Sequence, residues 1–295
     1  MLRGLILILL AHSALGQQIP RSLSQVSRGK AIRNLTGSVA LMSGAAASAS
    51  PRSSGPLALA SPASSVNTKS VIFLRHSRTE NNEYLHKHGW LPGFTDPGLR
   101  DTHLSEGGEE LVKALNKKIL RGESEANLSD VDLLVVSPLQ RTLQTATIGL
   151  DKVLLNRPDD RFIPRLICPL AAERVYMEAD VGRPRSVLEQ EWPQFDFSEL
   201  PADDSPWWWT GDQETYTEWR VPGHYSVLGE PRDVFGKRMV RFKQWLQARP
   251  ESKILVVAHW GTIFSLTGVE FENCQVEEFK TDSLLSDGEI LAVKV

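Results

Sequence analysis

Short apolar runs alternate with amphipathic stretches from residue 70 to the end of the chain. The runs that we expect to be strands are 71–74, 131–136, 162–167, 254–258 and 290–295. Between them, apolar residues recur at helical spacing after Ser105 and again after Pro231. This alternation predicts a single α/β domain with a largely parallel central sheet.

The stretch 174–230 interrupts this alternation. It contains five prolines and five tryptophans, three of them consecutive at 207–209. We interpret it as an insertion over the active site. The tryptophan run could stack on a substrate, but packing of the insertion against the domain is the expected role.

Polar residues follow three of the expected strands. Arg75 and His76 end the first, Ser137 and Pro138 follow the second, and His259 follows the strand at 254–258. The carboxyl ends of parallel strands lie along one edge of the sheet, where α/β folds keep their ligand sites. We therefore expect the three segments to converge on one anion.

These motifs resemble the histidine phosphatase superfamily, with the phosphoglycerate mutase-like branch as the nearest match. The residues that carry the resemblance are Arg75, His76, Ser137, Pro138, Arg141, Thr142, Glu173, His259 and Gly261, and within that branch Phe195 to Ser198 and the tryptophans at 207–209. The resemblance covers 70–295 and implies a three-layer α/β/α fold with an inserted lid. Ser77 and Trp260 depart from the family pattern, which usually has glycine and a small residue there.

The predicted chemistry is phosphoryl transfer through a protein nucleophile. Neutral imidazole is available near pH 7, so His76 is the expected nucleophile, with its second nitrogen fixed by a backbone hydrogen bond and a phosphohistidine as intermediate. Arg75 and Arg141 match phosphate oxygens and would hold the phosphate without a metal. Ser137 and Pro138 are expected to start the helix that carries Arg141.

The resemblance assigns two further catalytic roles. His259 would donate to the transferred phosphoryl group, and Gly261 would let the backbone approach it closely. Glu173 occupies the family position of the general acid and later base, which requires a raised pKa. Glu178 and Asp180 are nearby rivals for that role.

Substrate binding is predicted for a second set of residues: Asn82, Ser77, Gly261, Arg183 and Arg185. Asn82 matches the family's asparagine, and Asn81 is less favoured. The two arginines would recognise a second anionic group, or they are solvated charges of the insertion. His86 and His88 are expected to be surface histidines, because two histidines without nearby cysteine or paired carboxylates are weak metal ligands. We expect no metal and no cofactor.

Charge is distributed unevenly along the chain. Residues 1–70 contain seven lysines and arginines and no acid, so the remaining 26 basic and 36 acidic residues have a net charge of −10. This excludes the broad basic field that nucleic acid binding needs. The resemblance implies instead a small phosphorylated metabolite as partner, such as a sugar phosphate or phospho-sugar acid. Cys168 and Cys274 are too few for a disulfide framework and are expected to be buried thiols.

The N-terminus contains two expected targeting segments. Residues 1–16 have a basic residue, an apolar run and small residues, as in a secretory signal peptide, and that run is too short to span a membrane. Residues 17–69 are rich in serine and alanine and resemble a transit peptide. This order predicts import into a plastid with extra membranes and no stable membrane association after processing; the alternative is secretion.

The predicted function is a metal-independent phosphomonoesterase. Two alternatives stay open from the sequence: a phosphoglycerate mutase-type phosphoryl transfer, and a catalytically silent phosphate-ligand binding protein. The oligomeric state and the natural substrate are not predicted.

Overall fold

A five-stranded sheet lies at the centre of the computed structural model, which describes residues 69–88, 95–156, 159, 161–210 and 229–294. The strands are β1 (Ser70–Arg75), β2 (Leu133–Val136), β3 (Arg165–Ile167), β4 (Lys253–Ala258) and β5 (Val276–Lys280). Their order is β3-β2-β4-β1-β5, and only the β1–β5 pair is antiparallel. The predicted largely parallel sheet is therefore confirmed.

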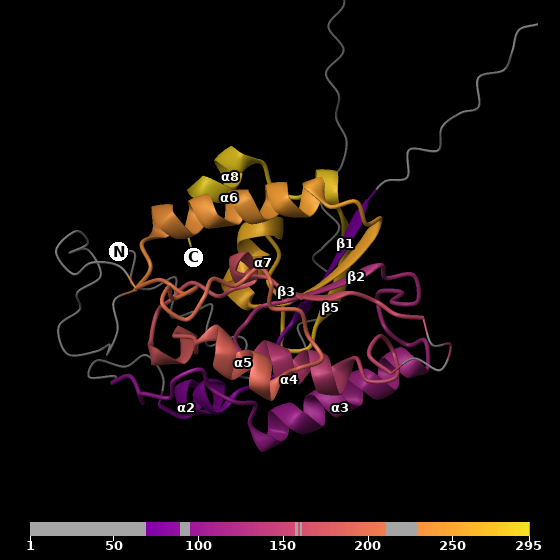
Figure 1. The fold of residues 1–295 in the computed structure, drawn as a ribbon, viewed down its shortest axis with the longest axis horizontal. Helices are drawn as coiled ribbons and strands as arrows, with labels where there is room; N and C mark the ends of the chain where they lie inside the picture. Colours follow the sequence, from indigo (N-terminus) through magenta and orange to yellow (C-terminus); the bar gives the residue numbers. More distant parts are fainter. Residues whose placement is uncertain (1–68, 89–94, 157–158, 160, 211–228, 295) are drawn as a thin grey trace, which may run out of the picture. The chain divides into compact units, whose positions relative to one another are not determined.

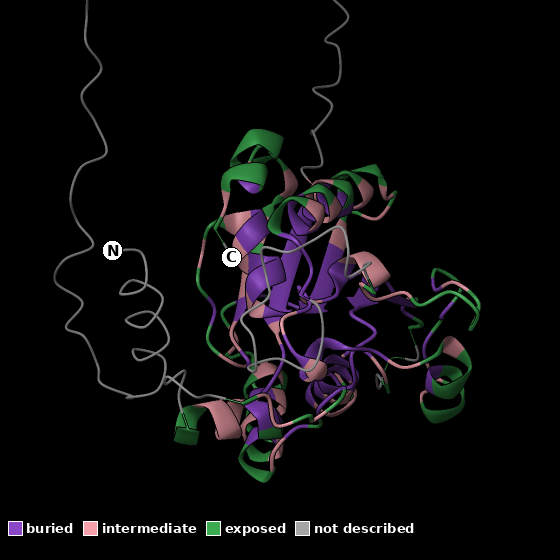
Figure 2. Ribbon diagram, turned by 90° about the vertical axis from the view of Figure 1, so that its left-hand side faces the viewer, coloured by how far each residue is buried: buried purple, intermediate pink, exposed green. Residues whose placement is uncertain are grey.

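Helices cover both faces of this sheet (Figure 1). One face carries α3 (Glu106–Leu120) and α4 (Gln140–Gly149), and the other carries α6 (Arg232–Ala248), α7 (Trp260–Thr267) and α8 (Asp287–Ala292). Side chains alternate along β1: Ile72 and Leu74 belong to the first core, Val71 and Phe73 to the second. Figure 2 shows the buried strands between helices whose outer faces are exposed. The predicted three-layer α/β/α architecture is confirmed.

Shorter elements surround these layers. They are α2 (Glu80–His88), α5 (Arg185–Glu191) and the 3-10 turns η1 (Pro169–Ala171), η2 (Glu178–Asp180) and η3 (Thr281–Ser283).

The prediction of a closing strand at 290–295 is wrong. Residues 290–292 are the last three residues of α8, Val295 lies outside the described residues, and the edge strand beside β1 is β5 instead. Ser286 accepts a hydrogen bond from the amide of Glu289, whose carboxylate accepts from the amide of Ser286, and this reciprocal capping favours a helix. Ile290 is buried, so its apolar character serves helix packing.

The expected strand at 162–167 is shorter than predicted. It begins only at Arg165, and the side chain of Phe162 is 77% exposed. Pro164 directly precedes the strand and has no amide hydrogen to contribute to the ladder, although its carbonyl accepts from Leu134.

Parts of the insertion at 174–230 pack into the domain core. Asp196 pairs with Leu166 beside β3, and Phe195 and Phe197 enter the core shared with α3 and α4. Trp207 packs against that core, and its indole nitrogen donates to the carbonyl of Arg183 at 2.8 Å. Packing is therefore the role of Trp207. Residues 211–228 of the insertion lie outside the described part of the chain.

The predicted signal peptide and transit-like segment also lie outside the described residues, apart from Lys69. Within the described ranges, no helix is both long enough and apolar enough to cross a bilayer.

Replacing Gly108 with alanine is expected to destabilise the protein. A Cβ atom there would lie 1.9 Å from the carbonyl oxygen of Arg78, in the loop that follows His76. Because backbone must move, we expect the free energy of unfolding to fall by about 1–3 kcal/mol. Urea denaturation measures this. Gly107→Ala is the matched control, since its nearest contact at 3.8 Å is ordinary; equal stability of the two variants would contradict the prediction.

Candidate active site

Three adjacent parallel strands end side by side and bring the predicted catalytic residues together. The amide of His76 donates to Ala258 at 3.0 Å, and that of Ser137 donates to Val257 at 3.1 Å. Pairing thus continues one residue beyond β1 and β2. His76 and His259 consequently lie with ring centroids 5.1 Å apart.

His76 is buried and oriented by the backbone. Its Nδ1 lies 2.6 Å from the carbonyl oxygen of Ser77, as predicted for the second nitrogen. Because a carbonyl only accepts, Nδ1 carries the proton and Nε2 carries the lone pair. Burial, followed by the positive charges of Arg141 and Arg75, lowers the pKa of His76 well below its usual value. The ring is therefore neutral at neutral pH, as a nucleophile requires.

Ser77 fits where the family has glycine. Its side chain is buried, its hydroxyl donates to the carbonyl of Gly108 at 2.6 Å, and its amide donates to Thr145 Oγ1 at 2.9 Å. The departure is thus accommodated by hydrogen bonds that join the His76 loop to α3 and α4.

Arg141 is the second residue of α4 and is buried. Its Nη2 donates to the carboxylate of Asp180 at 2.9 Å, its Nη1 to Ala179 O at 2.7 Å, and its Nε to His259 Nδ1 at 3.2 Å. A guanidinium has five N–H donors, so three bonds leave two donors for another acceptor. Ala179 and Asp180 of η2 therefore orient Arg141, which is predicted to bind the phosphate.

The start of α4 differs from the sequence prediction. Leu139, not Ser137, is the N-cap residue, and Asp101 supplies the cap by accepting from the amide of Gln140 at 2.8 Å. Asp101 is distant in sequence, and no local signal marks it. The prediction for Ser137 is wrong because its hydroxyl accepts from His259 at 2.7 Å and from the amide of Leu139 at 3.5 Å, and from no amide within α4.

His259 is bonded through both ring nitrogens. Nδ1 accepts from Arg141, so Nε2 carries the proton and donates to Ser137 Oγ at 2.7 Å. Burial and the charge of Arg141 lower the pKa of His259 well below its usual value. His259 is thus a neutral histidine whose orientation is set by both partners, and its donation to a phosphoryl group stays a prediction.

Glu173 lies beside the His259 loop. Its carboxylate accepts from the amides of Gly261 at 3.0 Å and Arg174 at 2.9 Å. Burial, followed by the negative charge of Asp180, raises the pKa of Glu173, although both amides oppose this. A carboxyl with a raised pKa is suited to donate a proton, which is the predicted role of this residue.

Arg75 ends β1 and has electrostatic contact with both Glu173 and Arg141. Its Nη1 donates to the carbonyl of Phe271. Its Nε is a buried donor without a hydrogen-bond partner among the described residues. Two arginines, two neutral histidines and two carboxyls whose pKa values are raised by burial, Glu173 and Asp180, therefore meet at one edge of the sheet. The two arginines suit an anionic phosphoryl group.

Three residues predicted to bind substrate have other partners. Asn82 Oδ1 accepts from the amide of Thr79 at 3.1 Å, and Asn81, the less favoured neighbour, is the buried one. Arg183 pairs with Asp101 and Glu191. Arg185 pairs with Glu189 at 2.7 Å. Their roles in binding stay predictions.

Metal-type residues do not cluster in the described part of the chain: no group of three or more His, Cys, Asp or Glu there could hold an ion. His86 and His88 are exposed in the last turn of α2, as expected of surface histidines. Cys168 and Cys274 are buried free thiols, which agrees with the sequence interpretation.

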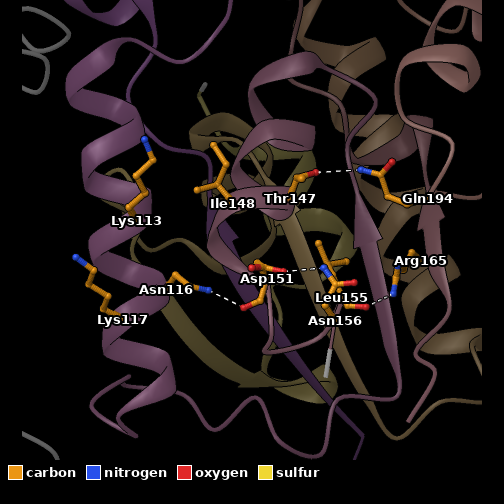
Figure 3. A pocket seen from close by; sticks show the side chains of 10 residues that line it. All are labelled: Lys113, Asn116, Lys117, Thr147, Ile148, Asp151, Leu155, Asn156, Arg165 and Gln194. Carbon is orange, nitrogen blue, oxygen red and sulfur yellow. Dashed lines mark hydrogen bonds between the residues drawn. The ribbon is translucent and has the colours of Figure 1, made fainter. Parts of the chain in front are cut away.

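A hollow of about 540 Å³ lies elsewhere, where α3, α4 and β3 meet (Figure 3). None of the predicted site residues lines it. Its polar groups are largely bonded to one another, for example Asn116 to the carbonyl of Asp151 and Gln194 to Thr147. We therefore place the candidate active site at the strand ends.

The chain is similar to two known proteins with related names. A phosphoglycerate mutase-like protein of Arabidopsis thaliana is 26% identical over 227 residues, which are 70% of this chain and 76% of that protein. A probable phosphatase of Schizosaccharomyces pombe is 26% identical over 135 residues, 46% of this chain and 55% of that protein. No protein-family model matches. The expected resemblance to phosphoglycerate mutase-like proteins and phosphatases is confirmed by these two relatives.

Solved structures show looser likenesses. The alpha-ribazole phosphatase of Shigella flexneri has a TM-score of 0.41 and 21% identity, and the match covers 71% of this chain and 89% of that one. The ecdysone phosphate phosphatase of the silkworm has a TM-score of 0.44 and 13% identity, covering 74% of this chain and 92% of that one.

Proposed function

We propose that this chain, a relative of phosphatases in the histidine phosphatase superfamily, hydrolyses phosphomonoesters of small metabolites through a phosphohistidine. The observation that carries the proposal is that two arginines, Arg75 and Arg141, lie near both a buried His76, whose pKa is lowered, and Glu173, whose pKa is raised. A nucleophile without a proton and an acid with one are the two groups that this reaction requires.

The first step transfers the phosphoryl group to the enzyme. His76 Nε2 attacks phosphorus, the bond from phosphorus to the ester oxygen breaks, and the leaving alkoxide takes the proton of Glu173. Arg75 and Arg141 bind the phosphoryl oxygens, whose charge they balance without a metal. The arginines are close enough to His76 and Glu173 to shift the pKa values of both.

The second step releases phosphate. The Glu173 carboxylate takes a proton from water, whose oxygen attacks phosphorus, and the phosphorus–nitrogen bond breaks so that its electron pair returns to His76 Nε2. His76 is thus regenerated as a neutral imidazole and Glu173 as an acid. One carboxyl serves as acid and then as base.

Hydrolysis is favoured over a mutase reaction because Arg183 and Arg185, the residues predicted to bind a second anionic group, are paired with carboxylates of the protein. A mutase must hold the carboxylate of a bound sugar acid while the phosphoryl group returns to another hydroxyl. Arg183 already bonds two carboxylates, and Arg185 bonds one. Their charges are therefore compensated within the protein, which supports the phosphatase and leaves the mutase as the alternative.

Catalytic activity is favoured over silent binding because the fold accommodates both departures from the family pattern, Ser77 and Trp260, without disturbing the site. The hydroxyl and the amide of Ser77 are hydrogen-bonded to Gly108 in α3 and Thr145 in α4. Trp260 stacks on Phe264, one turn along the same helix, with centroids 5.3 Å apart. Neither side chain displaces a predicted catalytic group from the cluster.

Steady-state phosphate release by the full chain tests the proposal. We expect release from p-nitrophenyl phosphate in excess EDTA, measured beside 3-phosphoglycerate. Interconversion of phosphoglycerates without net phosphate release would favour the mutase. Ligand binding without either reaction, across a panel of phosphomonoesters, would favour the silent binder.

We further propose that the chain is routed through the secretory pathway to a plastid, on the composition of residues 1–70. A fluorescent fusion of these residues in a cell with such a plastid would separate plastid import from the secreted alternative.

Replacing Asp180 by asparagine is expected to lower the pKa of Glu173. The Asp180 charge is the second cause, after burial, that raises this pKa, and its removal also leaves the positive charge of Arg141 uncompensated. The alkaline fall of kcat/KM for an alkyl phosphate should therefore move to lower pH. Glu178→Gln is the control, because that carboxyl lies toward Arg100 at 4.0 Å. A shift to higher pH, or equal profiles, would contradict the assignment.

A further inference from the structure

One arginine outside the predicted catalytic set holds the loop that carries Glu173. Arg238 lies on α6, and its Nη1 donates to the carbonyls of Leu170 at 3.1 Å and Ala172 at 2.7 Å. Its Nη2 donates to the carbonyl of Glu173 at 3.1 Å. Three carbonyls within four residues are therefore bonded to a single guanidinium.

A buried carboxylate completes this arrangement. Glu230 Oε1 accepts from Arg238 Nε at 3.0 Å, and Oε2 accepts from Nη2 at 2.6 Å. The side chains of Arg238 and Glu230 are only 13% and 3% exposed. A guanidinium has five N–H donors, and the described contacts use all five.

The backbone of Glu230 holds the residues that follow Glu173. Its amide donates to the carbonyl of Val175 at 2.8 Å, and its carbonyl accepts from Arg174 Nε at 2.8 Å. The segment 170–175 is thus bonded at both ends of Glu173. On its other side, Thr262 donates to Ala172 O, and Gly261 donates to the Glu173 carboxylate.

We propose that Arg238, held by Glu230, is a positioning residue for the general acid: it fixes the Glu173 loop so that the Glu173 carboxyl lies where the leaving oxygen departs. This rests on the proposed function. Arg238 bonds the backbone of Glu173 and not its carboxyl, so it acts through geometry. A misplacement of about 1 Å costs on the order of 100-fold in rate, and a planar fork with five bonds prevents such movement.

Substitution of Arg238 should affect poor leaving groups most. An alkyl phosphate needs a proton on its leaving oxygen, whereas p-nitrophenolate leaves without one. For Arg238→Lys, which keeps the charge but cannot make five bonds in a plane, we expect kcat/KM for an alkyl phosphate to fall about 10- to 100-fold. For p-nitrophenyl phosphate the fall should be at most about threefold, because attack by His76 is untouched. If Arg238 had only a structural role, its substitution would lower kcat/KM for both substrates by the same factor.

Removing Arg238 alone leaves Glu230 as a buried unpaired charge and is expected to destabilise the fold. The double variant Glu230→Gln/Arg238→Met removes both charges and keeps the test possible if single variants do not fold. Arg241→Gln, an exposed arginine three residues along α6, is the matched control.

The experiment combines the two substrates with amide hydrogen exchange of segment 169–175 in the full chain. Faster exchange than in Arg241→Gln, together with the selective loss for the alkyl phosphate, is the expected result. Unchanged exchange, or equal loss for both substrates, would overturn the proposal. If the unmodified protein hydrolyses no phosphomonoester while Arg238→Lys accelerates exchange, the proposed function fails and the positioning of the loop stands.

Discussion

Alanine in place of His76 is expected to remove phosphate release and the phosphoenzyme together. The covalent path requires the Nε2 lone pair, and no other described histidine occupies that position, because His259 bonds Arg141 and Ser137 through its two nitrogens. We expect kcat to fall on the order of 10⁴-fold or more, as when other enzymes lose a covalent nucleophile. Quenched-flow detection of a base-stable, acid-labile phosphoenzyme measures the step directly.

The lowered pKa of His76 sets the condition for this measurement. Protonation would block attack, but the ring stays neutral as the pH falls below the usual histidine value of about 6.5. The phosphoenzyme should therefore still form at a pH slightly below that value. His86→Ala, on the exposed end of α2, is the control and should keep wild-type activity. Phosphoenzyme in His76→Ala would transfer the nucleophile's role to another residue.

Glutamine in place of Glu173 is expected to give the second largest loss. The proton for the leaving oxygen disappears, so kcat/KM for an alkyl phosphate should fall about 10²- to 10⁴-fold. The loss should be smaller for p-nitrophenyl phosphate, whose leaving group needs no proton. Comparison with Asp180→Asn separates the rivals, because the true acid shows the larger selectivity between the two substrates.

The pH dependence of kcat/KM tests the direction in which the pKa of Glu173 is shifted. Burial and Asp180 raise the pKa of Glu173, so the acid form persists to higher pH than for an exposed glutamate. In the wild type, kcat/KM for an alkyl phosphate should be level below that raised pKa and should fall as the pH rises through it. Glu173→Gln should lack this fall. A fall retained unchanged in Glu173→Gln would mean that a different group donates the proton.

The same raised pKa links the site to stability. The native protein holds the Glu173 proton to higher pH than the unfolded chain does, so this contribution to stability is present at low pH and is lost as the pH rises. The amides of Gly261 and Arg174 limit the loss, because they bond the charged carboxylate.

Asp180 connects two predicted functions. It orients Arg141 through a 2.9 Å ion pair, and its own carboxylate accepts from the amides of Tyr176 and Met177. It is also a cause of the raised Glu173 pKa. In the sequence it is distinguishable from Glu178 only as another acid near Glu173, so its position in the site could not be assigned.

The sequence by itself determined the alternation of strands and helices and the identities of His76, Arg141 and His259 as neighbours. Apolar periodicity reflects burial of side chains on a sheet or helix face, and parallel strands bring their carboxyl ends to one edge. Tertiary structure alone decided that Ser137 bonds His259 and that Arg183 pairs with Asp101. These pairings join residues far apart in the chain, for which the local sequence carries no signal. The same holds for Arg238, which bonds the carbonyl of Glu173 from 65 residues further along the chain.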